Sequence, residues 1–161
     1  MPAVMTRRTT DALLVLALLV PSALTAVAGA GSAHAAAQCR STAITTSGVQ
    51  AQWDVCLTGS PAPVASVEPP TCARRTIIGD EHRQCVIEGT YVLSKGTQTL
   101  KSGSFQAVNQ QDDGTTVRPW PVSFACQGNG DYTLSARVRK LTYAGSAAAV
   151  DVTSRITATL C

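Results

Sequence analysis

Six cysteines and one histidine are the residues beyond the apolar N-terminal segment that could do covalent or metal chemistry. The histidine is His82, and the cysteines are Cys39, Cys56, Cys72, Cys85, Cys126 and Cys161. An even number of cysteines in an exported chain predicts disulfides, here three, rather than a metal site or a nucleophilic thiol. The sequence contains no C-x-x-C, H-E-x-x-H, phosphate-loop or calcium-loop pattern, so we expect no metal and no cofactor.

Acid–base or nucleophilic catalysis through a histidine would depend on His82. This residue lies in the charged, loop-like stretch 79–83, where a single histidine is usually solvated. Two carboxylates could meet for glycoside hydrolysis, but no pattern selects a pair. We therefore expect a protein that is not an enzyme, with a secreted hydrolase as the least favoured alternative.

The N-terminal segment has the features of a secretion signal. Arg7 and Arg8 precede an apolar run from Ala12 to Ala30, and the small residues of Ala33-His34-Ala35 suit a signal peptidase. We expect residues 1–35 to be removed, which leaves 36–161 as a single extracellular domain without a membrane anchor. The formal net charge of +3 is too small to favour a nucleic-acid partner.

The rest of the chain alternates apolar and polar residues with the period of a β-strand. Runs of this kind cover residues 49–57, 87–93, 120–126, 132–139 and 150–160, with Gly, Pro or Asn between them. The sequence predicts an all-β fold, a small antiparallel β-sandwich with three disulfides, or alternatively a β-barrel. Residues 58–71 contain four prolines, so we expect an extended crossing loop there that forms no ladder.

One disulfide follows from strand register. Ser47-Gly48 is typical of a two-residue hairpin turn, in which opposed residues have numbers that sum to a constant. Cys39 and Cys56 have the same sum as Ser47 and Gly48, so the hairpin places these two cysteines opposite each other. We expect the pair Cys39–Cys56.

Two further bridges are expected, Cys72–Cys85 and Cys126–Cys161. In a simple three-strand meander over 120–161, Cys126 and Cys161 would lie on strands two spacings apart, about 9–10 Å, which is too far for a disulfide. The second bridge therefore requires strands that converge, or strands that belong to opposite sheets. The latter favours a sandwich.

A short motif occurs twice. Residues 85–94 and 126–135 both follow C-x-x-x-G-x-Y-x-L-S, with Tyr and Leu on one face of a strand. A duplicated binding unit or shared strand-entry chemistry would each explain it, and we favour the latter. The G-x-Y-x-L part resembles the strand entry of immunoglobulin-like modules on exported bacterial proteins. This resemblance implies an immunoglobulin-like sandwich, although the Cys-Trp-Cys order of a true immunoglobulin domain is absent.

The segment around Arg74 suggests one specific function. Pro69-Pro70 and Cys72 precede Arg74 and Arg75, and this local spacing resembles the loops of secreted bacterial subtilisin-inhibitor-type proteins. A stiff, exposed loop with a basic residue suits a trypsin-like pocket. An extracellular serine protease inhibitor is therefore the alternative function, and a solvated dibasic turn or strand edge is the simpler interpretation.

Our main expectation is a secreted binding protein whose ligand is an unknown protein or glycan. Trp120 is a candidate platform for a sugar. However, Trp120 and Trp53 each lie on the apolar side of an alternating strand pattern, which favours a place in the core. Arg137 and Arg139 are candidates for a small basic stripe, for which an ordinary solvated outer face is the simpler interpretation.

Overall fold

Eleven β-strands make up the part of the chain that the structure describes, and this part contains no helix. The structure is a computed structural model that describes residues 37–59, 61–110 and 116–161. The expected signal at 1–35 lies outside these ranges. The strands are β1 (Gln38–Thr46), β2 (Val49–Thr58), β3 (Val64–Val67), β4 (Thr71–Thr76), β5 (Gly79–His82), β6 (Cys85–Lys95), β7 (Gln98–Gln110), β8 (Thr116–Arg118), β9 (Trp120–Ser123), β10 (Gly130–Tyr143) and β11 (Ser146–Leu160). The prediction of an all-β fold is confirmed.

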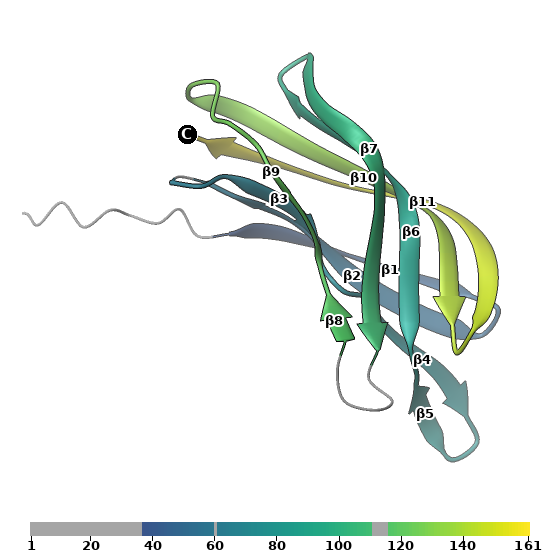
Figure 1. Cartoon of the computed structure of the whole chain (residues 1–161). Helices are drawn as coiled ribbons and strands as arrows, with labels where there is room; N and C mark the ends of the chain where they lie inside the picture. Colours follow the sequence, from purple (N-terminus) through teal and green to yellow (C-terminus); the bar gives the residue numbers. More distant parts are fainter. Residues whose placement is uncertain (1–36, 60, 111–115) are drawn as a thin grey trace, which may run out of the picture. The chain divides into compact units, whose positions relative to one another are not determined.

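The strands form two antiparallel sheets (Figure 1). The first has the order β5-β4-β2-β3-β9, with β1 on the other edge of β2, and the second has the order β11-β10-β6-β7-β8. The chain passes from the second sheet to the first at Pro119, between β8 and β9. On another side, β1 and β11 approach each other, and the hydroxyls of Thr42 and Ser154 lie 2.5 Å apart. The predicted antiparallel sandwich with three disulfides is confirmed.

The hairpin of β1 and β2 has the register expected from its turn. Ser47 and Gly48 have φ angles of 48° and 75°, which are the left-handed values that such a turn requires. Cys39 is opposite Cys56, with their Cα atoms 4.1 Å apart, and the two form a disulfide.

The expectation of a ladder-free loop over 58–71 is wrong in its central part. Val64–Val67 forms β3, which pairs with β2 on one edge and with β9 on the other. The prolines flank this strand instead of interrupting it, so its ladder donors remain. β3 and β4 pair with the same edge of β2, one after the other along its length. Pro69 and Pro70 lie between these two strands.

The other two disulfides join the sheets. Cys72 on β4 bonds Cys85 at the start of β6, and Cys126 after β9 bonds Cys161 after β11. Their Cα atoms are 5.9 and 5.8 Å apart. β9 lies in the first sheet and β11 in the second, so Cys126 and Cys161 come from opposite sheets. Their disulfide therefore does not have to span two strand spacings within one sheet.

The core lies between the sheets, and both copies of the repeated motif contribute side chains to it. Tyr91 and Leu93 on β6 and Tyr132 and Leu134 on β10 are all buried, and Leu93 is directly opposite Leu134. Gly89 permits the close approach of these strands, because a Cβ there would lie 2.0 Å from the carbonyl oxygen of Arg137. The register of β10 shifts between Val138 and Lys140, beside this contact.

Candidate interaction site

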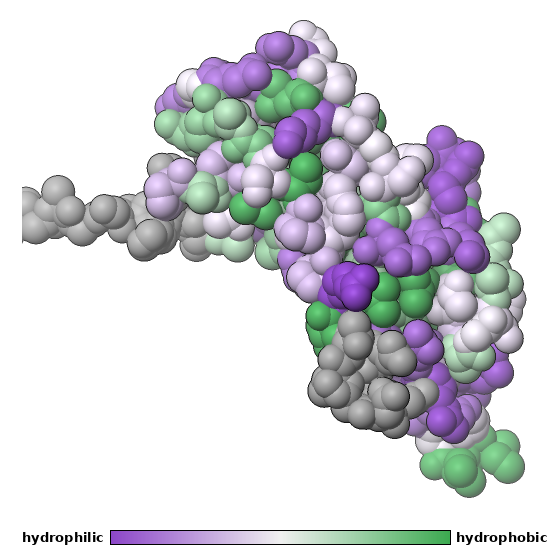
Figure 2. Space-filling view, viewed as in Figure 1, coloured by the Kyte–Doolittle hydropathy of each residue, from purple (hydrophilic) through white to green (hydrophobic). Residues whose placement is uncertain are grey.

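The hairpin of β4 and β5 ends in two isoleucines that have no cover. Ile77 and Ile78 have relative exposures of 104% and 95%, the highest of the large apolar side chains described. The hairpin extends beyond the ends of the neighbouring strands (Figure 1), and its far end is an apolar cluster beyond polar residues (Figure 2, lower right). We call Ile77 and Ile78 the hairpin tip.

Thr76 holds the turn of this hairpin. Its hydroxyl donates to the carbonyl oxygen of Gly79 at 2.7 Å and accepts from the backbone N–H of Ile78 at 3.4 Å. Gly79 has a φ of 131°, which a residue with a Cβ rarely adopts. Turns usually contain Asn, Asp, Gly or Pro, so two β-branched residues here are poorly explained by local preference.

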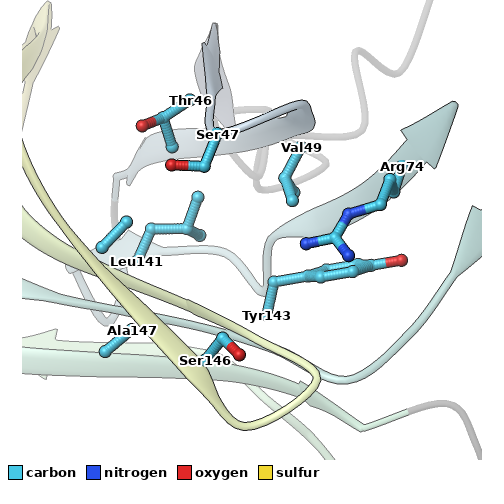
Figure 3. Close-up of a pocket in the computed structure, with 9 residues that line it drawn as sticks. Thr46, Ser47, Val49, Arg74, Leu141, Tyr143, Ser146 and Ala147 are labelled. Atoms are coloured by element: carbon cyan, nitrogen blue, oxygen red, sulfur yellow. The ribbon is translucent and has the colours of Figure 1, made fainter.

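The base of the hairpin is fixed to both sheets. The Cys72–Cys85 disulfide ties β4 to β6, and the Tyr143 hydroxyl on β10 donates to the carbonyl oxygen of Glu81 on β5 at 2.6 Å. The guanidinium of Arg74 lies over the Tyr143 ring (Figure 3), 5.1 Å from its centroid. Burial, followed by the charge of Glu81, raises the pKa of Tyr143, while Arg74 and Arg83 oppose this shift.

A small cavity opens beside this stacked pair. It has a volume of about 120 Å³ and lies between the β1–β2 turn, with Thr46 and Ser47, and the start of β11, with Ser146 (Figure 3). Val49 and Leu141 supply apolar wall. The cavity separates the hairpin base from the two turns at this end of the sandwich, and it is too small for a drug-sized ligand.

The side chain of Arg74 is exposed, as expected, but the residue does not lie in a loop. Arg74 lies within β4, where Val49 of β2 is opposite it on one edge and Glu81 of β5 on the other. Both edges of its backbone therefore face strands, and its side chain stacks on Tyr143. Arg75 is exposed and lies opposite Asp80. The turn of the same hairpin carries Ile77 and Ile78, the most exposed of the large apolar side chains described.

Arg137 and Arg139 do not form an uncompensated basic stripe. Arg137 binds Asp151 through two nitrogens, at 2.6 and 2.5 Å, and Arg139 reaches the same carboxylate at 3.0 Å. The hydrogen bond from Arg137 is the main cause that lowers the pKa of Asp151 to about 2, and it raises the pKa of Arg137. This carboxylate compensates part of their charge on the outer face of the second sheet.

The two tryptophans differ in burial. Trp53 is 2% exposed and belongs to the core, as its parity predicts. Trp120 is only partly buried, and its ring lies beside an open hollow between β7 and β9 with a volume of about 700 Å³. Its parity points it inward, but its place at the crossing between sheets leaves it at the margin of the core.

His82 lies on the exposed face of β5 and shares a hollow of about 200 Å³ with Asp80, Gln50 and Gln52. Within the described ranges, no three His, Cys, Asp or Glu residues are placed to hold a metal ion. The same residues include no helix that is long and apolar enough to cross a membrane. All six cysteines are in disulfides, which is consistent with an oxidising environment.

Sequence reasoning missed the hairpin tip. The available signal was Thr76-Ile77-Ile78-Gly79 inside a disulfide loop with a sequence separation of 13, surrounded by charged residues. Apolar residues at the centre of so short a loop have little reach toward a core. A two-residue turn at Ile77 and Ile78 was therefore recognisable as exposed.

No protein-family model, curated protein or solved structure matches this chain. The two copies of the repeated motif fall on the neighbouring strands β6 and β10. The immunoglobulin-like relationship stays a prediction.

Proposed function

We propose that this protein is a secreted, non-catalytic binding module that inserts Ile77 and Ile78 into an apolar pocket of a protein partner. The observation that carries this proposal is the almost complete exposure of both side chains, 104% and 95%. Burying an isoleucine fully contributes about 1.5–3 kcal/mol, so the tip offers about 3–6 kcal/mol. That is the size of a small hot-spot cluster in a protein interface.

The rigidity of the hairpin supports the same function. An isolated two-stranded hairpin is marginally stable in water. Here the Cys72–Cys85 bridge, the bond from Tyr143 to Glu81 and the contacts of Thr76 restrain it before any partner arrives. A contact that is ordered in advance loses less conformational entropy on binding.

The charges around the tip indicate the chemistry of the partner. The hairpin carries Arg74 and Arg75 on β4, Asp80 and Glu81 on β5, and Arg83 directly after β5. Arg83 forms an ion pair with Glu81 at 2.8 Å. The arginines of this region outnumber its acidic residues, so its net charge is positive. We infer an apolar pocket with a mildly acidic rim. We infer a protein partner because a pocket can enclose both isoleucines of so small a tip, and binding to a lipid surface is a separate outcome of the test below.

A binding role is also consistent with the residues that could have done chemistry. His82 is exposed on β5 with a single carboxylate, Asp80, in the same hollow. The cysteines form three disulfides within the sandwich, and this supports an extracellular location.

The test compares capture by three purified, disulfide-bonded proteins from the culture medium of the source organism. They are the wild type, Ile77→Ser/Ile78→Ser, and the control Val92→Ser, which alters an apolar side chain 42% exposed on β6. We expect the wild type and the control to capture the same protein, and titration with that purified protein to show a loss of about 100-fold or more in the double variant.

Three outcomes would contradict the proposal. Equal capture by all three proteins would remove the role of the tip. Binding to lipid vesicles that the double variant loses would assign the tip to a membrane. A captured protein that binds the double variant as tightly as the wild type would place the interface elsewhere. A captured protease that needs the tip would support the proposal and make the protein an inhibitor that uses Ile77 and Ile78 instead of Arg74.

A further inference from the structure

The open hollow beside Trp120 is separate from the hairpin tip and results from the way the chain changes sheets. β8 covers the edge of β7 only from Val108 to Gln110. The chain then turns at Pro119 and continues as β9 in the other sheet, where it pairs with β3. The edge of β7 around Phe105 is therefore left beside the hollow, which has a volume of about 700 Å³.

Aromatic rings fix Trp120 at this place. Its ring centroid lies 4.2 Å from that of Tyr91 and 5.9 Å from that of Phe105, and both pairs are tilted. Gly103 leaves the space next to Tyr91 without a side chain, since a Cβ there would lie 3.2 Å from the ring. Trp120 is thus a partly buried ring held by its neighbours, with part of its surface still accessible.

Polar groups of both charges lie around the same hollow. Glu88 accepts a hydrogen bond from Gln106 at 2.7 Å and contacts Lys140 at 2.9 Å. The bond from Lys140, followed by that from Gln106, lowers the pKa of Glu88, so its carboxylate is ionised and oriented. A carboxylate has about four acceptor positions, and these contacts use two of them. Arg118, which is exposed on β8, supplies donors next to Trp120.

We propose that this hollow binds a neutral oligosaccharide. The C–H face of a sugar ring stacks on the negative face of an aromatic ring such as Trp120. Neighbouring sugar hydroxyls donate to Glu88 and accept from Arg118, which suits a ligand rich in both donors and acceptors. Lys140 compensates the charge of Glu88, and Arg118 adds a positive charge that disfavours a cationic ligand. A purely apolar ligand would use neither the remaining acceptor positions of Glu88 nor the donors of Arg118.

The test uses tryptophan fluorescence of the purified, disulfide-bonded protein with Trp53→Phe, so that Trp120 is the remaining indole. The Trp53 N–H is buried without a hydrogen-bond partner among the described residues, so this change removes an unsatisfied donor. The probes are hexasaccharides of β-1,4-linked glucose, β-1,4-linked N-acetylglucosamine and α-1,4-linked glucose. We expect saturable binding of one probe class with a Kd of about 10 μM to 1 mM.

Variants at the rim connect the signal to this hollow. Arg118→Ala changes an exposed residue and keeps the fluorophore, and we expect it to weaken binding by about tenfold or more. Trp120→Ala in the Trp53-containing protein, measured by calorimetry, should remove binding. Ile77→Ser/Ile78→Ser should bind sugar as the wild type does, so the two proposals can fail separately. No saturable binding of any probe up to about 5 mM, or full binding by Arg118→Ala and Trp120→Ala, would overturn the inference.

Discussion

The guanidinium carbon of Arg74 lies 5.1 Å from the centroid of the Tyr143 ring. This contact joins β4 in the first sheet to the last residue of β10 in the second. The hydroxyl of the same tyrosine donates to Glu81 on β5. One side chain of the sandwich therefore restrains both strands of the hairpin, and the position of its apolar tip depends on the junction between the sheets.

Tyr143→Phe should loosen β5 while the ring stays under Arg74. Loss of the hydrogen bond to Glu81 should cost about 1 kcal/mol in the free energy of unfolding. Amide hydrogen exchange in β5 should become faster. Tyr132→Phe is the matched control, because the Tyr132 hydroxyl bonds Gln127 and Gly128 instead. Unchanged exchange in β5 would show that Tyr143 does not restrain the hairpin.

Arg74 should not act as the primary residue of a protease inhibitor. Strands lie on both sides of its backbone and its side chain lies over Tyr143, so a trypsin-like enzyme finds no free strand edge at this residue. We expect no inhibition of trypsin with a Kd below about 10 μM, and no difference between wild type and Arg74→Ala. Nanomolar inhibition that Arg74→Ala abolishes would contradict this assignment.

Asp151 should make stability depend on pH in the acid range. Its pKa is lowered from 3.8 to about 2 by Arg137 and Arg139. A lowered carboxylate pKa stabilises the fold above the unfolded-state value, and this contribution is lost as pH falls through the folded-state value. The denaturation midpoints of wild type and Asp151→Asn should therefore converge between about pH 4 and about pH 2.

Salt provides the control for this prediction. The pair is on the surface, so about 1 M salt should reduce the difference between wild type and Asp151→Asn at neutral pH. A difference that persists unchanged from neutral pH to about pH 2 would mean that packing, and not charge, separates the two proteins.

Gly89→Ala should destabilise the fold far more than Gly103→Ala. A Cβ at Gly89 would lie 2.0 Å from the backbone oxygen of Arg137, which has little freedom to move. At Gly103 the nearest atom is a ring carbon of Tyr91 at 3.2 Å. Denaturant unfolding should show a loss above about 2 kcal/mol for Gly89→Ala and below about 1 kcal/mol for Gly103→Ala. Equal losses would contradict the close approach of β6 and β10.

Local patterns in the sequence predicted the parts of this fold that local chemistry controls. Alternation identified the long strands, and Ser47-Gly48 placed Cys39 opposite Cys56 because a two-residue turn determines register. The prolines around Val64–Val67 hid β3, since its pairing comes from distant strands. The assignment of β9 to the first sheet is also a tertiary feature, although the Cys126–Cys161 bridge pointed toward it.

The candidate sites were harder to predict, because exposure depends on the whole fold. The parity of Trp120 gave its direction but not its place at the edge of the core. Arg74 looked like part of a free loop in the sequence, yet its backbone lies between β2 and β5, and its exposed side chain stacks on Tyr143. Ile77 and Ile78 were recognisable as exposed from their place in a short disulfide loop, but only the fold shows that their hairpin extends beyond the neighbouring strands.

Site-specific photo-crosslinking from the hairpin tip tests the central claim most directly. A benzophenone side chain replaces Ile78 in one protein and Val92, which is 42% exposed on β6, in the other. Both are irradiated in the culture medium of the source organism. We predict an adduct with one partner protein from position 78 and none with that partner from position 92. Equal adducts from both positions, an adduct only with a second copy of this chain, or no adduct from position 78 would contradict the account.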